Sequence, residues 1–245
     1  MEAAIRGGAK IIQLRKKELP ARDLYRMALA FRQITTEAGM LLIINDHVDI
    51  ALAVDADGVH LGQEDLPLSA ARRIAPEPLI GISTHSRAEA LKAQGEGADY
   101  VNIGPIFPTR TKEGVTGFLG PEAIPGIVAG LEIPFTVMGG IGAANIERVL
   151  AQGARRVAVV TAVTMADDMG RGGCGPAGNN QKLQSSLTAM MIIAITSTIR
   201  ITFSPRRTDT LAAHQPPVAL PPARKSPSVQ SIFPVAANTA IAGMV

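Results

Sequence analysis

The stretch LLIINDHVDIALAVDADGVHLGQED, residues 41–65, decides the fold. It begins with an apolar, β-branched run at 41–44 and ends with a second at 57–61, and each run predicts a short strand. Residues 47–54 between them have helical apolar spacing. A strand that returns through a helix lies parallel to the first strand, because an antiparallel return needs only a tight turn. The stretch therefore predicts a parallel α/β unit.

Two carboxylates follow these strands. Asp46 comes just after the first strand and Asp65 just after the second. The carboxyl ends of parallel strands meet at one edge of the sheet, where the active sites of α/β folds lie. Two carboxylates there would repel each other unless a cation lay between them, and hard oxygen ligands beside phosphate groups suit Mg²⁺. The alternative is that each aspartate caps the helix that follows it.

Strands and helices alternate along most of the chain with a period of about 20 to 25 residues, which is typical of a (β/α)₈ barrel of the TIM type and not of two domains. Seven strands can be recognised, so we expect an incomplete barrel without a clear closing helix. Besides the two above, strands are expected at residues 10–14, 79–82, 100–103, 134–138 and 157–160.

The composition indicates a globular body with a basic tail. Of the 245 residues, 47% are hydrophobic, and the formal net charge is +3. Residues 1–164 carry 17 Lys and Arg against 18 Asp and Glu, whereas residues 165–245 carry 7 against 3. The basic balance comes from the tail, so it does not indicate a nucleic-acid surface on the body.

The cysteine content and the lengths of the apolar runs bear on the cellular location of the protein. A single cysteine, Cys174, excludes an internal disulfide framework and fits a reducing, cytoplasmic location. The first residues lack the apolar run of a signal peptide. The longest apolar run, 187–199, contains Ser and Thr and falls short of the ~20 residues that a membrane helix needs. We therefore expect no membrane partner.

The alternating pattern ends near Asp168. Residues 169–245 are rich in Gly, Pro, Ser, Thr and Ala without a clear period, which is typical of low-complexity segments that cannot build a core. Within them, residues 181–196 are the candidate for a helix after the last strand. We expect residues 1–168 to form the barrel domain and residues 169–245 a disordered tail that does not complete it.

Polar residues follow the expected strands, and in a barrel all of them face one rim. The cations Arg15, Lys17 and Lys112 suit a diphosphate, with Mg²⁺ bridging it to the two aspartates. The main-chain N–H groups of residues 139–140, both glycines, and those after Thr161 suit a second phosphate. Alternatively, the cations belong to a solvated loop and the glycines to a plain strand-to-helix turn.

His60 has two interpretations as well. It is either a core residue that is hydrogen-bonded to a neighbouring carbonyl or a catalytic residue.

Taken together, these motifs resemble the thiamine phosphate synthase family, also called thiamine-phosphate pyrophosphorylase. The matching motifs are QLRKK (13–17), IIND (43–46), ADGVHLGQED (56–65), IGISTHS (80–86), GADYVNIGPIFPTRTK (97–112), VMGGI (137–141) and VAVVTAV (157–163). The resemblance implies a Mg²⁺-dependent transferase of thiamine biosynthesis. Such an enzyme joins 4-amino-2-methyl-5-hydroxymethylpyrimidine diphosphate to 4-methyl-5-(2-hydroxyethyl)thiazole phosphate, giving thiamine phosphate and pyrophosphate.

The resemblance also implies a role for each matching residue. Ser83 and Lys112 would be catalytic, beside the reacting carbon and the diphosphate. Asp46 and Asp65 would hold the metal ion. The substrate-binding residues would be Gln13 at the pyrimidine, Arg15, Lys17, Asn45, Ser83 and Lys112 at the diphosphate, and Thr109, Thr111, Gly140 and Thr161 at the thiazole phosphate.

The chain departs from the family in two places. The family begins with a strand and helix before the strand at 10–14, whereas this chain opens inside that first helix, and after Asp167 the match ends. We therefore hypothesise a barrel that lacks its first strand and is poorly folded or weakly active. The functional alternatives are a thiazole tautomerase-like barrel and an inactive phosphate-binding remnant. The expected partners are small phosphorylated substrates, and a homo-oligomer is compatible with the sequence.

Overall fold

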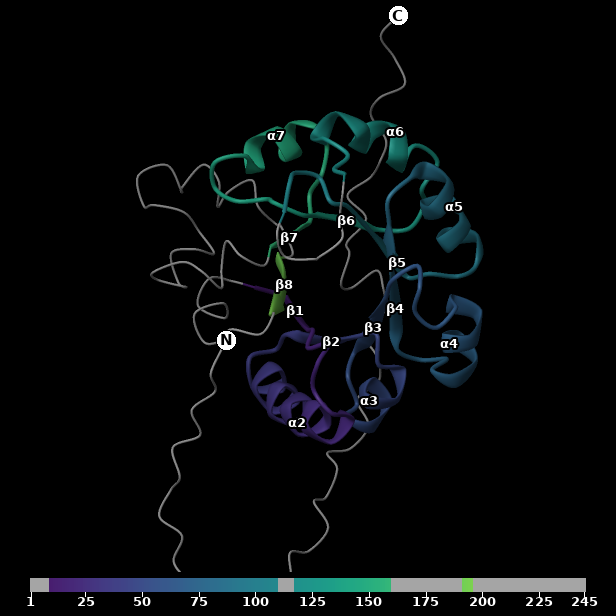
Figure 1. The fold of residues 1–245 in the computed structure, drawn as a ribbon, viewed down its shortest axis with the longest axis vertical. Helices are drawn as coiled ribbons and strands as arrows, with labels where there is room; N and C mark the ends of the chain where they lie inside the picture. Colours follow the sequence, from purple (N-terminus) through teal and green to yellow (C-terminus); the bar gives the residue numbers. More distant parts are fainter. Residues whose placement is uncertain (1–8, 110–116, 160–190, 196–245) are drawn as a thin grey trace, which may run out of the picture.

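The computed structural model describes residues 9–109, 117–159 and 191–195. Eight parallel strands pair in chain order and close into a barrel (Figure 1). Each of the seven predicted strands is present, so the predicted α/β barrel of the TIM type is confirmed. The strands are β1 (Ile11–Leu14), β2 (Leu41–Asn45), β3 (Gly58–Leu61), β4 (Leu79–Thr84), β5 (Tyr100–Ile103), β6 (Phe135–Met138), β7 (Val157–Val159) and β8 (Met191–Ile195).

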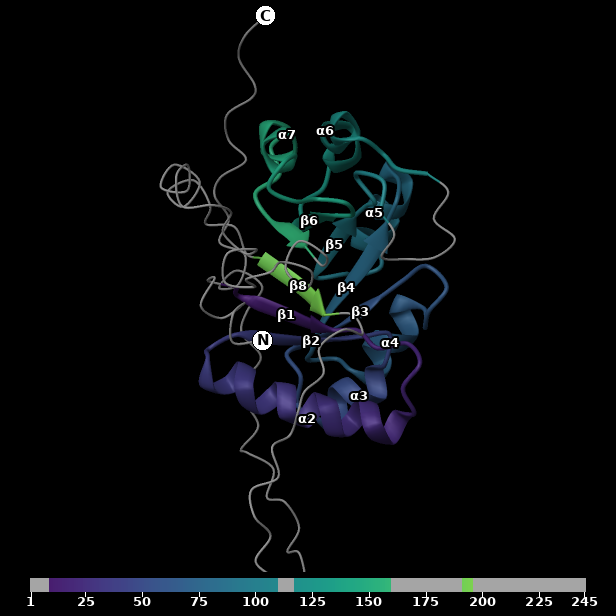
Figure 2. The same cartoon turned by 60° about the vertical axis from the view of Figure 1, so that its left-hand side comes forward.

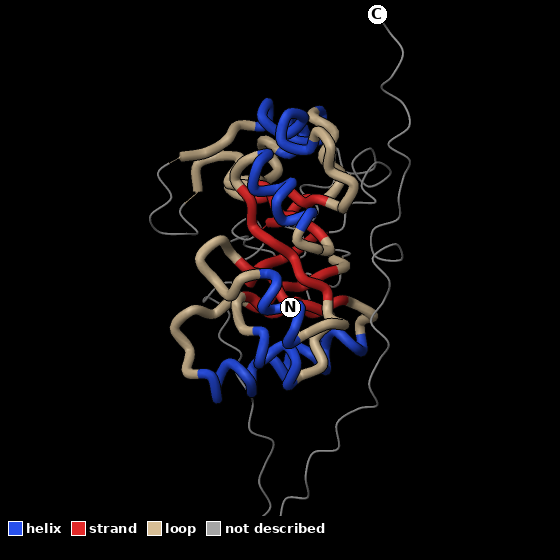
Figure 3. The backbone as a smooth tube through the Cα atoms, turned by 90° about the vertical axis from the view of Figure 1, so that its right-hand side faces the viewer, coloured by secondary structure: helices blue, strands red, loops and turns tan. Residues whose placement is uncertain are grey.

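The helices lie outside the ring of strands (Figures 2 and 3). Helix α2 shows why: Leu24, Ala28 and Phe31 recur at helical spacing and are buried against the barrel. No helix in the described ranges is long and apolar enough to cross a membrane. The helices are α2 (Ala21–Glu37), α3 (Val48–Ala53), α4 (Leu68–Ile74), α5 (Arg87–Gly95), the 3₁₀ helix η1 (Pro121–Ala123), α6 (Ile124–Val128) and α7 (Ile146–Ala151).

The alternation of side chains along each strand creates two apolar layers. One set packs inside the barrel, where Ile11, Ile43, Leu79, Tyr100 and Ala158 form a cluster. The neighbouring residues in each strand point outward and pack against the helices in a larger core. Because both faces of the strands are buried, the strands are nearly continuous apolar runs, and polar residues concentrate at their ends.

Two ion pairs, one buried and one partly buried, hold the amino-terminal ends of the strands. Asp57, which precedes β3, accepts from Arg32 Nη1 of α2 at 2.7 Å and from the main-chain N–H of Leu42 at 2.8 Å. The arrangement is repeated two strands later, where Asp99 accepts from Arg72 Nη2 of α4 at 2.5 Å and from a main-chain N–H of β4 at 2.7 Å. These contacts lie at the end opposite the polar strand ends and therefore stabilise the barrel.

The eighth strand corrects two predictions. Residues 191–195 (MIIAI) form β8, which pairs in parallel with β7 and with β1. The prediction of a barrel left open by a missing strand is therefore wrong, and so is the prediction that the tail does not complete it. The helix predicted at 181–196 is likewise wrong for these five residues. A short apolar run fits a buried strand or a buried helix equally well by its periodicity. The rest of the predicted tail, and the division at residue 168, lie outside the described residues.

Candidate active site

The first carboxylate of the candidate site, Asp46, follows β2 directly. Its φ is 65°, in the left-handed region, where Asp and Asn are the commonest residues after Gly. Its main-chain N–H donates to the carbonyl oxygen of His60 on β3 at 2.9 Å. This bond extends the pairing of β2 and β3 by one residue and fixes Asp46 at the carboxyl end of the barrel. Backbone strain of this kind is concentrated at functional sites.

The second carboxylate, Asp65, follows β3 in a tight turn. Its Oδ2 accepts from the main-chain N–H of Gly62 at 2.6 Å. A Cβ at Gly62 would lie only 2.9 Å from this oxygen, so the turn favours glycine there. The turn therefore holds the carboxyl group of Asp65 in a defined place.

The two carboxyl groups are neighbours. Burial, then a hydrogen bond to Asp65 and the negative charge of Asp65, raise the pKa of Asp46 to about 6. Burial alone raises the pKa of a carboxyl group, but the hydrogen bond and the charge of Asp65 act only at short range. The structure thus brings Asp46 and Asp65 together at the carboxyl ends of adjacent strands, as the sequence predicted.

Cations border this pair. Lys17 Nζ lies 3.8 Å from Asp46 Oδ2, and its side chain is half exposed. Arg15 and Lys17 both act to lower the pKa of Asp46, but burial and Asp65 outweigh them. The segment after β1 lies here because Leu14 pairs with Ile44, which places residues 15–17 beside the end of β2. The rim therefore carries both the anionic pair and cations that could bind a phosphate group.

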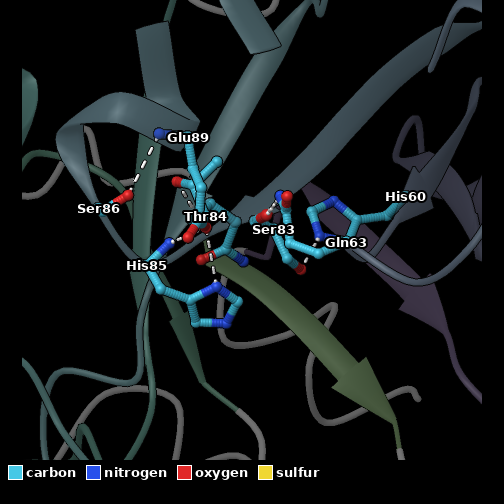
Figure 4. Close-up of polar contacts among 8 residues, drawn as sticks. His60, Gln63, Ser83, Thr84, His85, Ser86 and Glu89 are labelled. Atoms are coloured by element: carbon cyan, nitrogen blue, oxygen red, sulfur yellow. Dashed lines mark hydrogen bonds and ion pairs between the residues drawn. The ribbon is translucent and has the colours of Figure 1, made fainter. Parts of the chain in front are cut away.

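Ser83 stands at the centre of a second polar group (Figure 4). Its Oγ lies 2.9 Å from His60 Nε2, and its carbonyl oxygen accepts from Gln63 Nε2 at 2.6 Å. The other ring nitrogen of His60, Nδ1, lies 3.0 Å from the hydroxyl oxygen of Tyr100. His60 is thus bonded to two side-chain hydroxyls, so the predicted bond to a neighbouring carbonyl is wrong. Ser83 lies within β4, which extends to Thr84, instead of just past a strand.

Two buried amides complete the floor of the site. Gln13 on β1 is 4% exposed and Asn45 at the end of β2 is 9% exposed. Both lie in the carboxyl-terminal halves of adjacent strands, and the carboxylates and cations follow them in the chain. Buried amides need hydrogen-bonding partners, so this floor suits a ligand with a polar ring.

The loops after β5 and β6 are held against each other. The N–H groups of Ile106 and Phe107 donate to the carbonyl oxygens of Met138 and Gly139 at 2.8 and 3.0 Å. Gly140 has a φ of 64°, and a Cβ there would lie 2.5 Å from the Pro108 oxygen. Glycine is therefore required at this close approach, which brings the main chain of Gly140 next to the loop that leads to Thr109.

Three predicted residues, Thr111, Lys112 and Thr161, lie outside the described residues, and their roles stay predictions. Within the described part of the chain, no group of three or more His, Cys, Asp or Glu could hold a metal ion. The Asp46 and Asp65 pair still fits Mg²⁺, because Mg²⁺ is commonly held by one or two carboxylates together with waters and substrate phosphates.

Tyr100 is a member of the site that was not predicted from the sequence. Its hydroxyl reaches His60 only because Gly81 leaves space, since a Cβ at Gly81 would overlap the Tyr100 ring. The signal was present in the order of the strands: His60, Gly81 and Tyr100 occupy matching positions on β3, β4 and β5.

Comparisons with known proteins point to one family. A family model described as thiamine monophosphate synthase matches residues 1–163. The thiamine-phosphate synthase of Chloroflexus aurantiacus is 47% identical over 169 residues, which are 69% of this chain and 78% of that protein. That of Chlorobium luteolum is 52% identical over 165 residues, which are 67% of this chain and 78% of that protein.

Solved structures agree. Thiamine phosphate pyrophosphorylase from Pyrococcus furiosus is 39% identical, with a TM-score of 0.67 over 76% of this chain and 86% of that one. A 3-hexulose-6-phosphate synthase, 16% identical, has a TM-score of 0.53 over 76% of this chain and 92% of that one. The second similarity concerns the barrel fold alone.

Proposed function

The chain belongs to the thiamine monophosphate synthase family, and we propose that the rim described above is where it joins a pyrimidine diphosphate to a thiazole phosphate. The products are thiamine phosphate and pyrophosphate. In the reaction the bond between the pyrimidine methylene carbon and the diphosphate oxygen breaks, and the thiazole nitrogen forms a bond to that carbon. Because the aminopyrimidine tolerates a carbocation-like methylene, no side-chain nucleophile is needed.

The departing diphosphate carries the charge that the site must stabilise. Arg15 and Lys17 border the rim, and Lys112 is proposed to join them as a third cation. Asp46 and Asp65 would hold Mg²⁺, which, when bound, neutralises charge on the phosphate oxygens as a Lewis acid. Proximity of the Lys17 ammonium to Asp46 supports one shared site for metal ion and diphosphate.

Binding of the two organic substrates is assigned to separate parts of the rim. The buried amide of Gln13 would bind the pyrimidine and that of Asn45 the diphosphate, with Ser83 next to the reacting carbon and the diphosphate. The thiazole phosphate would bind at Thr109, Thr111, Gly140 and Thr161. The close packing of Gly140 on the loop after β5 supports a main-chain phosphate site there. Holding both substrates in line supplies much of the rate enhancement.

One observation carries this proposal: two carboxylates from adjacent strands share a hydrogen bond at the carboxyl end of a barrel, with cations beside them. The test is an assay of the full chain with both substrates and Mg²⁺, in which pyrophosphate and thiamine phosphate are measured together. Equal amounts of the two products, lost on addition of EDTA and restored by Mg²⁺, are expected.

The other outcomes identify the rival functions. Isomerisation of a thiazole phosphate without release of pyrophosphate would favour a tautomerase-like barrel, and ligand binding without turnover would favour an inactive remnant. A turnover far below that of the Chloroflexus aurantiacus relative would support the hypothesis of a weakly active chain. The cytoplasmic location and the homo-oligomer stay predictions.

A further inference from the structure

His60 lies deep in the barrel, below the rim at which the substrates are proposed to bind. It is on β3 and only 4% exposed, and both of its ring nitrogens contact hydroxyl groups. One of these hydroxyls belongs to Ser83, which is half-buried at the rim, and the other to Tyr100, which is 2% exposed. His60 therefore joins the closed interior of the barrel to a residue that faces the substrates.

The barrel is built to allow this contact. His60, Gly81 and Tyr100 lie side by side in register on three adjacent strands. The Tyr100 ring occupies the space above Gly81 that any side chain would fill, and its centroid lies 5.6 Å from that of His60. The hydroxyl of this buried tyrosine then contacts the imidazole on the side away from Ser83.

The direction of the hydrogen bonds decides what Ser83 can do. A phenol is a better donor than an imidazole N–H, and an imidazole nitrogen is the better acceptor, so the Tyr100 hydroxyl donates to Nδ1. Nε2 of His60 then carries the hydrogen and donates to Ser83 Oγ. With its oxygen already accepting from below, the Ser83 hydroxyl keeps its own hydrogen for a partner at the rim.

The opposite arrangement would not serve the proposed reaction. If Nε2 accepted from Ser83, the only hydrogen of that hydroxyl would point into the barrel, and lone pairs would face the diphosphate. A diphosphate offers acceptors alone, so it would be repelled. An imidazolium would also donate from Nε2, so the direction of the bond to Ser83 does not depend on whether His60 is charged.

We propose that His60, held by Tyr100, is a positioning residue for the transfer reaction: it donates to Ser83 Oγ and so directs the Ser83 hydroxyl hydrogen to the departing diphosphate. This inference rests on the proposed function, since it needs a substrate with a diphosphate at the rim. It gives the buried histidine a role that the sequence left open between core and catalysis.

A double-mutant cycle tests the inference. Ser83→Ala and His60→Leu each lower kcat by about 10- to 100-fold, with KM changed less than about threefold, because a misdirected donor costs transition-state stabilisation. The double variant is no slower than the slower single variant, because His60 acts through Ser83. His60→Gln keeps kcat within about fivefold, since its amide N–H can replace Nε2–H. Losses that multiply in the double variant would overturn the proposal.

A matched control separates this role from general effects of histidine replacement. His85 is exposed on the same end of the barrel and is bonded to Glu89, not to Ser83 (Figure 4). His85→Leu is expected to leave kcat within about twofold. If His60→Leu shows no cooperative unfolding transition, Tyr100→Phe takes its place in the cycle, because it removes the donor that fixes Nδ1. The same non-additivity with Ser83→Ala is then expected, and multiplying losses would again overturn the proposal.

The tautomer itself can be read directly. In NMR spectra of ¹⁵N-labelled protein, the histidine signals that disappear in His60→Gln are expected to show a hydrogen bonded to Nε2. A hydrogen on Nδ1 alone would overturn the proposal whatever the activity. This measurement needs no turnover. A chain that makes no thiamine phosphate would refute the proposed function, but the tautomer of His60 would still show whether its hydrogen bonds run as proposed.

Discussion

Replacing Asp57 by alanine probes the end of the barrel that carries no proposed chemistry. The Asp57 and Arg32 side chains are 7% and 10% exposed, and the carboxylate also accepts from a main-chain N–H of β2. Removing one partner of a buried ion pair costs about 3–5 kcal/mol, because the other charge stays buried without it. Arg32 keeps its bonds to the Asp55 carbonyl oxygen and the Thr36 hydroxyl. We therefore expect a loss of about 3 kcal/mol in the free energy of unfolding, at the lower end of that range.

The assay is urea denaturation of the purified variants. With an m-value of about 1–3 kcal/mol per molar urea, the midpoint for Asp57→Ala falls by about 1 M or more. Glu122→Ala is the control, because its ion pair with Arg148 is exposed and is worth less than about 1 kcal/mol. The turnover of folded Asp57→Ala stays close to that of the unmodified chain. If the two variants lost the same stability, the reasoning from burial would be refuted.

Three further predictions concern the rim and the histidine below it. Lys112→Ala removes most of the turnover but changes the urea midpoint little; an unchanged rate would refute its assigned role. Gly140→Ala raises KM for the thiazole phosphate and destabilises the chain by about 1–3 kcal/mol, because its φ is 64°. Gly95→Ala, with nothing within 4 Å of the added Cβ, does neither. Burial lowers the pKa of His60 from 6.5 to about 4, so between these values the unfolded chain binds a proton that the folded chain excludes. The contribution of His60 to stability therefore falls by up to about 3 kcal/mol as the pH drops through this window, whereas the raised pKa of Asp46 contributes in the opposite direction. His60→Gln should lack this dependence in urea titrations at several pH values, and an equal pH dependence would contradict the assignment.

The sequence was most informative where local pattern and tertiary structure agree. In residues 41–65, apolar runs of strand length flank a short helix, and a parallel unit must bring the carboxyl ends of its strands together. The proximity of Asp46 and Asp65 follows from that topology alone. The backbone conformation of Asp46 does not, because a left-handed φ depends on its bond to the His60 carbonyl.

Contacts between residues that are far apart in the sequence could not be predicted from local sequence patterns. The run 191–195 is apolar and short, so only the open position between β7 and β1 decides that it is a strand. The contact of Tyr100 with His60 depends on strand register, and the pairing of Arg32 with Asp57 on how α2 packs. Neither leaves a periodic signal in the sequence.

The proposed reaction requires that Asp46 and Asp65 hold one Mg²⁺ ion beside a diphosphate. Calorimetric titration of Mg²⁺ into the full chain with pyrophosphate measures this directly, with Asp49→Asn as an exposed carboxylate control on α3. Protonation of Asp46, whose pKa burial and Asp65 raise to about 6, competes with the metal ion. Affinity should therefore fall by up to about tenfold for each pH unit below 6.

At pH 7.5 the unmodified chain and Asp49→Asn should bind about one Mg²⁺ ion per pyrophosphate, while Asp46→Asn and Asp65→Asn each weaken binding by about tenfold or more. Equal Mg²⁺ affinity in all four proteins, or an affinity that is the same at pH 5 and pH 7.5, would contradict the shared carboxylate site.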